Sequence, residues 1–191
     1  MNMSGTSFQK NISGAFPISK ARLTDLLIPF VLGMLAIVAH AGIKLHLGIP
    51  GHNGIVFMAL LLISKKTSKI RWSSLIFTAG VGSMLYIPFN GLNDPFVFLV
   101  YLWPGITFDL FHYFRTNLKS KFWLLSLSGG LAYSTIPLSR FVLGISTGIF
   151  HKSVTSGLLL PFFLFFVFGF IGTSIGIGIT GTGKLITKKN E

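Results

Sequence analysis

Cysteine is absent from this chain of 191 residues, and only four acidic side chains stand against sixteen Lys and Arg. Without cysteine there is no disulfide framework, no thiolate metal site and no thiol nucleophile. So few acids leave little from which to build paired catalytic carboxylates, and the chain contains neither H-E-x-x-H nor G-x-S-x-G. We therefore expect no enzyme activity and no bound cofactor.

The chain is rich in long apolar runs and poor in charged residues. Hydrophobic residues make up 51% of the chain and charged residues 10%, far from the composition of a soluble domain. A net charge of +12 favours nucleic acid only where basic residues form a polar face, and here they stand between apolar runs. The composition predicts a membrane protein in contact with lipid and no nucleic-acid partner. The polar first twenty residues predict no cleaved signal peptide.

Six apolar stretches are candidates for membrane-spanning helices, each of which needs about 20 mostly apolar residues. They are residues 23–43, 53–64, 73–89, 95–114, 122–145 and 156–179. The second and third are short, so we expect them to thin the bilayer or to lean on protein neighbours. A five-span topology with a re-entrant second segment also fits. The predicted fold class is an all-α integral membrane protein, a compact bundle of six transmembrane helices.

Lysine and arginine fall on alternate sides of these segments, thirteen against three, which by the positive-inside rule predicts orientation. The larger group is Lys10, Lys20, Arg22, Lys65, Lys66, Lys69, Arg71, Arg115, Lys119, Lys121, Lys184, Lys188 and Lys189. The smaller group is Lys44, Arg140 and Lys152. Both termini are thus predicted to be cytoplasmic, with a tail over 1–22, a membrane domain over 23–181 and a basic tail over 182–191. The expected location is the cell membrane.

The stretch GIGITGTGKL, residues 176–185, matches most of the phosphate-binding pattern G-x-x-x-x-G-K-[ST]. A phosphate loop follows a strand and opens a helix, whereas this stretch closes an apolar span and has Leu185 in the magnesium-binding place. We therefore expect no nucleotide site. The glycines are expected either to end a helix or to let a neighbouring helix approach closely, with Gly172 and Gly176 as a GxxxG pair.

One acid, Asp109, lies inside a predicted span near its cytoplasmic end, with His112 and Arg115 at one-turn steps after it. An acid at that depth is either functional or neutralised by a partner. The simpler interpretation is an ion pair with Arg115 or with another basic residue of the cytoplasmic side.

Hydrogen-bonding groups gather on the predicted outer side, where charges are few. The candidates for a small-molecule site with aromatic walls are Arg140, His52, Asn53, Asn90, Asn93, Asp94, Tyr101, Trp103 and Tyr133. Polar loops and interfacial aromatics are ordinary in membrane proteins, so each residue alone has a structural explanation. A metal site is the alternative, because His40, His46, His52, Asp94 and His151 all belong to this side.

The size, the six spans, the glycine-rich last span and the run NGLNDPFVFLVYLWPGITFDLF together resemble the S components of energy-coupling-factor transporters. The resemblance implies a substrate-capturing membrane subunit for a vitamin or vitamin precursor, working with a coupling transmembrane subunit and cytoplasmic ATPases. It also implies that small residues of the first span, here Gly33, Ala36 and Ala39, meet the coupling subunit. Nickel and cobalt members start with Met-His, whereas this chain starts MNMSGTS, so no metal is expected.

The function predicted from the sequence is therefore the uptake of a small water-soluble nutrient. Three alternatives stay open, namely a stand-alone small permease, a metal-ion uptake protein and a non-transporting membrane assembly or interaction protein. A secondary transporter commonly shows broken helices or coupling acids in two related halves, and no internal repeat is visible here.

Overall fold

The described part of this computed structural model, residues 20–42, 51–86, 96–114, 122–148 and 157–189, is all-α and contains no strand. Its six helices are α2 (Lys20–Gly42), α3 (Gly54–Thr67), α4 (Ser73–Leu85), α5 (Val97–Phe114), α6 (Phe122–Thr147) and α8 (Leu159–Lys189). Each falls on one of the six apolar stretches, so the predicted all-α class is confirmed. The main deviation is α8, which continues about ten residues past its apolar stretch.

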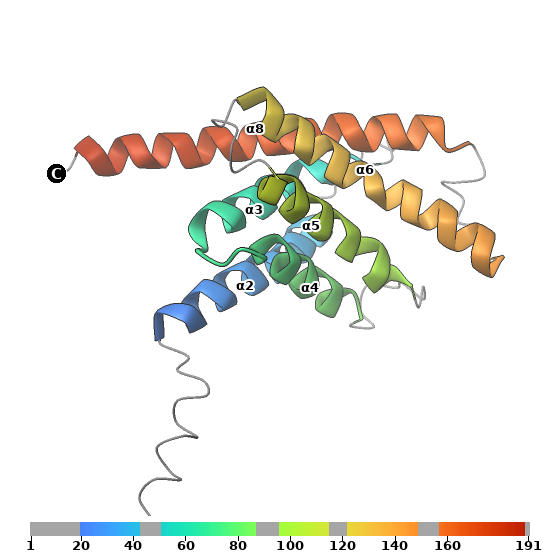
Figure 1. Ribbon diagram of the computed structural model, residues 1–191, viewed down its shortest axis with the longest axis horizontal. Helices are drawn as coiled ribbons and strands as arrows, with labels where there is room; N and C mark the ends of the chain where they lie inside the picture. Colours follow the sequence, from blue (N-terminus) through green and yellow to red (C-terminus); the bar gives the residue numbers. More distant parts are fainter. Residues whose placement is uncertain (1–19, 43–50, 87–95, 115–121, 149–156, 190–191) are drawn as a thin grey trace, which may run out of the picture.

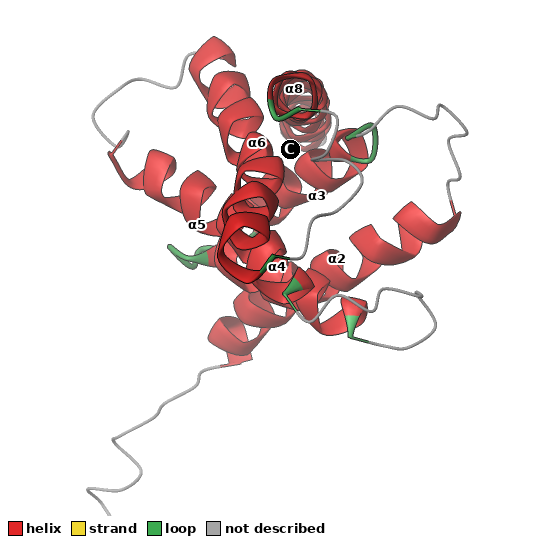
Figure 2. Ribbon diagram, turned by 90° about the vertical axis from the view of Figure 1, so that its right-hand side faces the viewer, coloured by secondary structure: helices red, strands yellow, loops and turns green. Residues whose placement is uncertain are grey.

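The long helices α6 and α8 pack together above a smaller group formed by α2, α3, α4 and α5 (Figure 1). Figure 2 shows α8 nearly end-on beside α6 and α3. Contacts define the helix directions. Ser126 Oγ lies 2.9 Å from Ser174 Oγ, and Gly130 lies against Phe166, which makes α6 and α8 antiparallel. In Figure 1, accordingly, α6 ends and α8 begins on the right, and α8 ends on the left.

Within the lower group, helix α3 connects to the upper one, because it packs against α8 as well as against α2 and α4. A Cβ at Gly172 would lie 2.5 Å from the carbonyl oxygen of Ile55, and a Cβ at Gly176 would lie 3.0 Å from that of Ala59. Only glycine permits this backbone approach at Gly172, so the interpretation of the GxxxG pair as a packing surface is confirmed. The interpretation that the glycines end the helix is wrong, because α8 continues through residues 176–185 to Lys189. A phosphate loop is excluded for the same reason.

Helices α2 and α4 cross at a pair of glycines. Gly33 of α2 lies against the backbone of Phe77 and Val81, and Gly80 of α4 lies against the backbone of Phe30. Ala36 is 4% exposed on the same face of α2. Within the chain, α4 covers Gly33 and Ala36 belongs to the buried core. Contact of Gly33, Ala36 and Ala39 with a coupling subunit therefore stays a prediction, and the first two offer no exposed surface for it. The exposed face of α2 carries Leu27, Val31, Leu35 and Val38 instead.

The surface is more apolar than that of a soluble protein, and the apolar core also contains buried hydroxyl groups. Large apolar side chains are exposed, as shown by Leu159 at 86%, Phe163 at 63% and Ile145 at 63%. Hydroxyl groups are buried, at Ser64, Ser73, Ser74, Thr78, Ser126, Ser128, Ser134 and Thr173. Several of them donate to carbonyl groups three or four residues earlier in their own helix, which satisfies a hydroxyl without water.

Two segments, Val97–Phe114 and Leu159–Gly181, are long and apolar enough to cross a membrane. They support association with a membrane, and six crossings remain a prediction. Helices α3 and α4 have 14 and 13 residues. At about 1.5 Å per residue they are shorter than a hydrocarbon layer of about 30 Å. The central helix α3 buries seven residues against its neighbours, so it leans on protein as expected.

Candidate functional site

Aromatic side chains from four helices meet around Tyr133 of α6. The Tyr133 ring stacks on Phe165 of α8 with centroids 5.0 Å apart, and it lies 5.6 Å from Phe57 of α3. Phe57 in turn lies 6.0 Å from Tyr101 of α5. The ring of Tyr133 also covers Gly54 at the start of α3, where a Cβ would collide with it. We call Phe57, Tyr101, Tyr133 and Phe165 the aromatic cluster.

Arg140 lies two turns beyond Tyr133 on the same helix, so both side chains project from one face of α6. Its guanidinium is close enough to Tyr133 to act electrostatically on the phenol. The Nε atom of Arg140 is buried and has no hydrogen-bond partner. A buried N–H without an acceptor is unfavourable by about 1–3 kcal/mol, so Arg140 Nε is a candidate for an acceptor that the described residues do not supply.

The other residues predicted for the site are placed as follows. His52 and Asn53 directly precede Gly54, which brings the start of α3 beside Tyr133. Trp103 is 51% exposed, whereas Tyr101 is packed against the core, so the structure separates Trp103 from the aromatic cluster. Asn90, Asn93 and Asp94 lie outside the described residues. The structure thus brings Tyr101, Tyr133 and Arg140 together and places His52 and Asn53 next to them.

The described residues provide no support for the alternative of a metal site. Among the described side chains, no group of three His, Asp or Glu could hold a metal ion. Of the five residues named for it, only the side chain of His52 is described, and it already has an interaction partner. Asp94, His46 and His151 lie outside the described residues, as does the side chain of His40.

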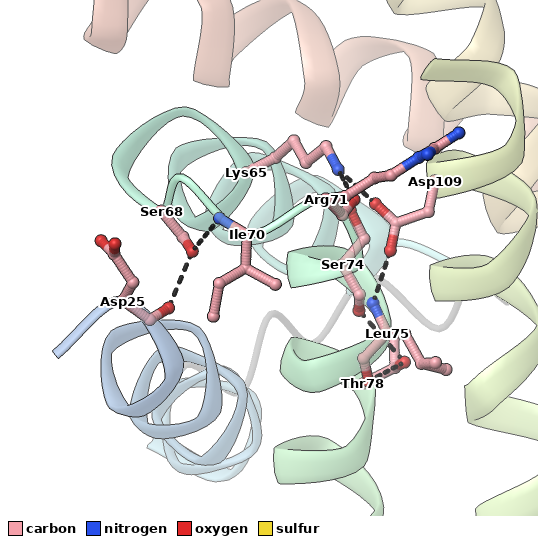
Figure 3. A network of polar contacts seen from close by, with 9 residues as sticks. All are labelled: Asp25, Lys65, Ser68, Ile70, Arg71, Ser74, Leu75, Thr78 and Asp109. Carbon is pink, nitrogen blue, oxygen red and sulfur yellow. Dashed lines mark hydrogen bonds and ion pairs between the residues drawn. The ribbon is translucent and has the colours of Figure 1, made fainter. Parts of the chain in front are cut away.

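A second polar region lies at the opposite ends of the helices (Figure 3). Asp109 Oδ1 accepts a hydrogen bond of 2.6 Å from Lys65 Nζ, and Asp109 Oδ2 accepts one of 2.9 Å from the backbone N–H of Leu75. Lys65 Nζ also donates to the carbonyl oxygen of Arg71. One carboxylate therefore ties together the end of α3, the start of α4 and the end of α5. The expected ion pair of Asp109 with a basic residue is confirmed, and the partner is Lys65.

The start of α2 joins the same region. Ser68 Oγ donates to the carbonyl oxygen of Asp25 over 2.7 Å and accepts from the backbone N–H of Ile70 over 3.1 Å. The carboxylate of Asp25 points away from Lys65 and Asp109 (Figure 3). The sequence predicted Lys65, Lys69 and Arg71 as part of a basic group and as possible partners of Asp109, but not that they belong to one structured site.

A pocket of about 390 Å³ opens beside this network, lined among others by Lys65, Lys69, Arg71, Asp109, His112 and Tyr113. Another, of about 320 Å³, is an apolar groove between α6 and α8, lined by Trp123, Leu124, Leu127, Phe166, Val167 and Phe170. The first has the charge to recognise an anion, and the second has no polar lining at all.

Comparison with family models, with curated proteins and with solved structures finds no match for this chain. The function is therefore inferred from the chemistry of the site itself.

Proposed function

We propose that the chain is a multi-pass membrane protein whose six helices cross the bilayer with both termini in the cytoplasm. Exposed leucine, isoleucine and phenylalanine with buried hydroxyls support this proposal, because lipid solvates apolar side chains and leaves polar ones to pack inside. Alternating helix directions support it as well. The network of Lys65 and Asp109 gathers one end each of α3, α4 and α5. Four of the predicted cytoplasmic basic residues, Lys65, Lys66, Lys69 and Arg71, lie in the last turn of α3 or in its connection to α4.

We further propose that the protein captures a small water-soluble nutrient from the outer side, as the substrate-binding subunit of an energy-coupling-factor type transporter. The observation that carries this proposal is the buried, unpaired Nε of Arg140 beside the aromatic cluster. A guanidinium near the hydrocarbon is unfavourable by up to roughly 3 kcal/mol on insertion scales. A ligand with a carboxylate, phosphate or carbonyl group would supply the missing acceptor and offset that energy.

The aromatic cluster suggests the rest of the ligand. Tyr101 and Tyr133 present flat apolar rings with a polar edge, and such walls recognise a planar or partly apolar body. His52 and Asn53 directly before α3 add hydrogen-bonding groups next to Tyr133. A molecule of vitamin size with one anionic or carbonyl group matches these features. Energy for uptake would come from separate ATPase subunits through a coupling transmembrane subunit.

The test is to identify small molecules that co-purify with the protein by mass spectrometry and then to measure their binding. Wild type is expected to carry one compound in near-stoichiometric amount, and Arg140→Gln is expected to lose it. Arg71→Gln is the matched control, because Arg71 lies at the opposite end of the helices and should retain the compound. A wild-type protein that carries and binds no small molecule would contradict capture and would favour a membrane assembly protein. Uptake by liposomes that contain this chain alone would favour a stand-alone permease.

A further inference from the structure

The pocket beside the Lys65–Asp109 pair has a surplus of fixed positive charge. Three Lys or Arg side chains line it against one carboxylate, Asp109. That carboxylate is already engaged twice, by Lys65 Nζ at 2.6 Å and by the backbone N–H of Leu75 at 2.9 Å. The charge of Lys65 is neutralised by its ion pair with Asp109. The two remaining cations, Lys69 and Arg71, have no ion-pair partner among the described residues.

Arg71 is held in place before any ligand arrives. Its carbonyl oxygen accepts a hydrogen bond from Lys65 Nζ, which fixes the main chain between α3 and α4. Its guanidinium lies over the ring of Tyr113, 3.8 Å from the centroid, which fixes the side chain. A guanidinium stacked on one face keeps its edge N–H groups available, and their fork matches two oxygens of a phosphate.

The aromatic residue Tyr113 lines this pocket, and two further exposed aromatic residues directly follow lining residues in the sequence. Trp72 is 44% exposed and follows Arg71 directly, while Tyr113 is 47% exposed and Phe114 is 71% exposed at the end of α5. Trp and Tyr at a helix end beside basic residues are typical of the depth at which lipid headgroups lie. The pocket therefore combines a preformed cationic fork with aromatic groups that suit a headgroup layer.

We propose that this pocket binds a phosphate group, with Arg71 as the bidentate contact and Lys69 as a second cation. The group belongs either to the headgroup of an anionic phospholipid or to a soluble phosphate. This binding site goes beyond the capture of a nutrient on the outer side, and neither proposal depends on the other's ligand. Occupation would tie the α3–α4 connection to the end of α5 and thereby stabilise the four helices α2 to α5.

The experiment titrates the detergent-solubilised full-length protein with short-chain phosphatidylglycerol, with short-chain phosphatidylcholine and with sodium phosphate, and it follows the unfolding temperature. The variants are Lys69→Gln/Arg71→Gln, Arg71→Lys and, as the matched control, Lys66→Gln. Lys66 is exposed in the last turn of α3, close in sequence to the other two, and does not line the pocket. Lys69→Gln alone replaces the double variant if the latter does not fold.

Phosphatidylglycerol is expected to stabilise the wild type at lower concentration than phosphatidylcholine does. The double variant should need about 25-fold more phosphatidylglycerol, because each basic residue near a lipid surface contributes about fivefold. Arg71→Lys should need a phosphatidylglycerol concentration between those of the wild type and the double variant. Lys66→Gln should need the same concentration as the wild type. Stabilisation by sodium phosphate as strong as that by phosphatidylglycerol at equal concentration would identify a soluble phosphate as the ligand. Stabilisation by phosphatidylglycerol at concentrations where sodium phosphate has no effect would identify the lipid. Equal losses in Lys66→Gln and in the double variant would overturn the proposal, as would a double variant that responds like the wild type.

Discussion

Lys65 Nζ lies 2.6 Å from Asp109 Oδ1, and this contact links the end of α3 to the end of α5 across 44 positions of sequence. The two side chains are 7% and 1% exposed. Each charge is removed from water and depends on the other. Since Asp109 also accepts from Leu75, the pair fastens three helices at one end of the molecule.

Removing one member of this pair should therefore be strongly destabilising. Asp109→Asn and Lys65→Met are each expected to lower the free energy of unfolding by about 3–5 kcal/mol, the range for a buried charge left alone. The double variant should lose much less than the sum, because it leaves no lone charge and Asn still accepts from Leu75. Unfolding of the purified proteins in detergent gives these values, with exposed Lys66→Met as the control. Additive losses would show that the two charges do not interact.

The packing of α3 against α8 gives a prediction for two glycines of one helix. Gly172→Ala places a Cβ 2.5 Å from the carbonyl oxygen of Ile55 and should cost about 1–3 kcal/mol of stability through overpacking. Gly178→Ala meets nothing within 4 Å and should instead stabilise α8 by up to about 1 kcal/mol through helix propensity. Thermal unfolding of both variants measures the difference. Equal effects would mean that α8 does not pack on α3 in this way.

The absence of cysteine makes the proposed topology directly testable, because every single-cysteine variant has one thiol. Thr67 and Ser146 are both exposed. Thr67→Cys should react with a membrane-impermeant thiol reagent only after the cells are opened. Ser146→Cys should react in intact cells, because it lies at the other end of the helices. Labelling of Thr67→Cys in intact cells would refute the six-span orientation.

Arg140→Lys tests whether the guanidinium fork contacts the captured ligand. Lysine keeps the positive charge but loses the bidentate geometry, so the affinity should fall by about 1.5–3 kcal/mol, the range for a hydrogen bond to a charged group. Isothermal titration with the co-purified compound measures this change. Arg71→Lys is the same substitution at the other end and should leave the affinity intact. A folded Arg140→Lys protein with wild-type affinity would remove Arg140 from the site.

Variants of Ala36 and Leu35, two neighbours on α2, distinguish internal packing from contact with a coupling subunit. Ala36 is 4% exposed, whereas Leu35 is 48% exposed. Ala36→Phe should overpack the core beside α2 and reduce ligand binding and uptake together. Leu35→Ala should retain ligand binding and reduce uptake if this face meets the coupling subunit. Ligand binding and cellular uptake are measured for both variants, and unchanged uptake in Leu35→Ala would place this position against lipid.

The candidate site was only partly accessible to sequence reasoning. The position of Arg140 between apolar residues singled it out, because a cation is costly there. The proximity of Tyr101 and Tyr133 was predicted only from their similar expected depth in the membrane. Their connection through Phe57 depends on how three helices cross. The cationic pocket was not foreseen. Its residues were recognised as a charge pattern, and a charge pattern does not show that Arg71 stacks on Tyr113.

By itself the sequence determined the type and approximate limits of the six helices in the described residues, because long apolar runs interrupted by basic residues leave few alternatives to helix. It also determined the charge asymmetry between the two sets of connections. The tertiary structure alone decided that Gly33 packs against α4, that Ala36 is buried and that Asp109 pairs with Lys65. Helical periodicity defines the faces of a single helix. Which helix covers a given face depends on side-chain fit between segments far apart in the chain, and no local pattern encodes that fit.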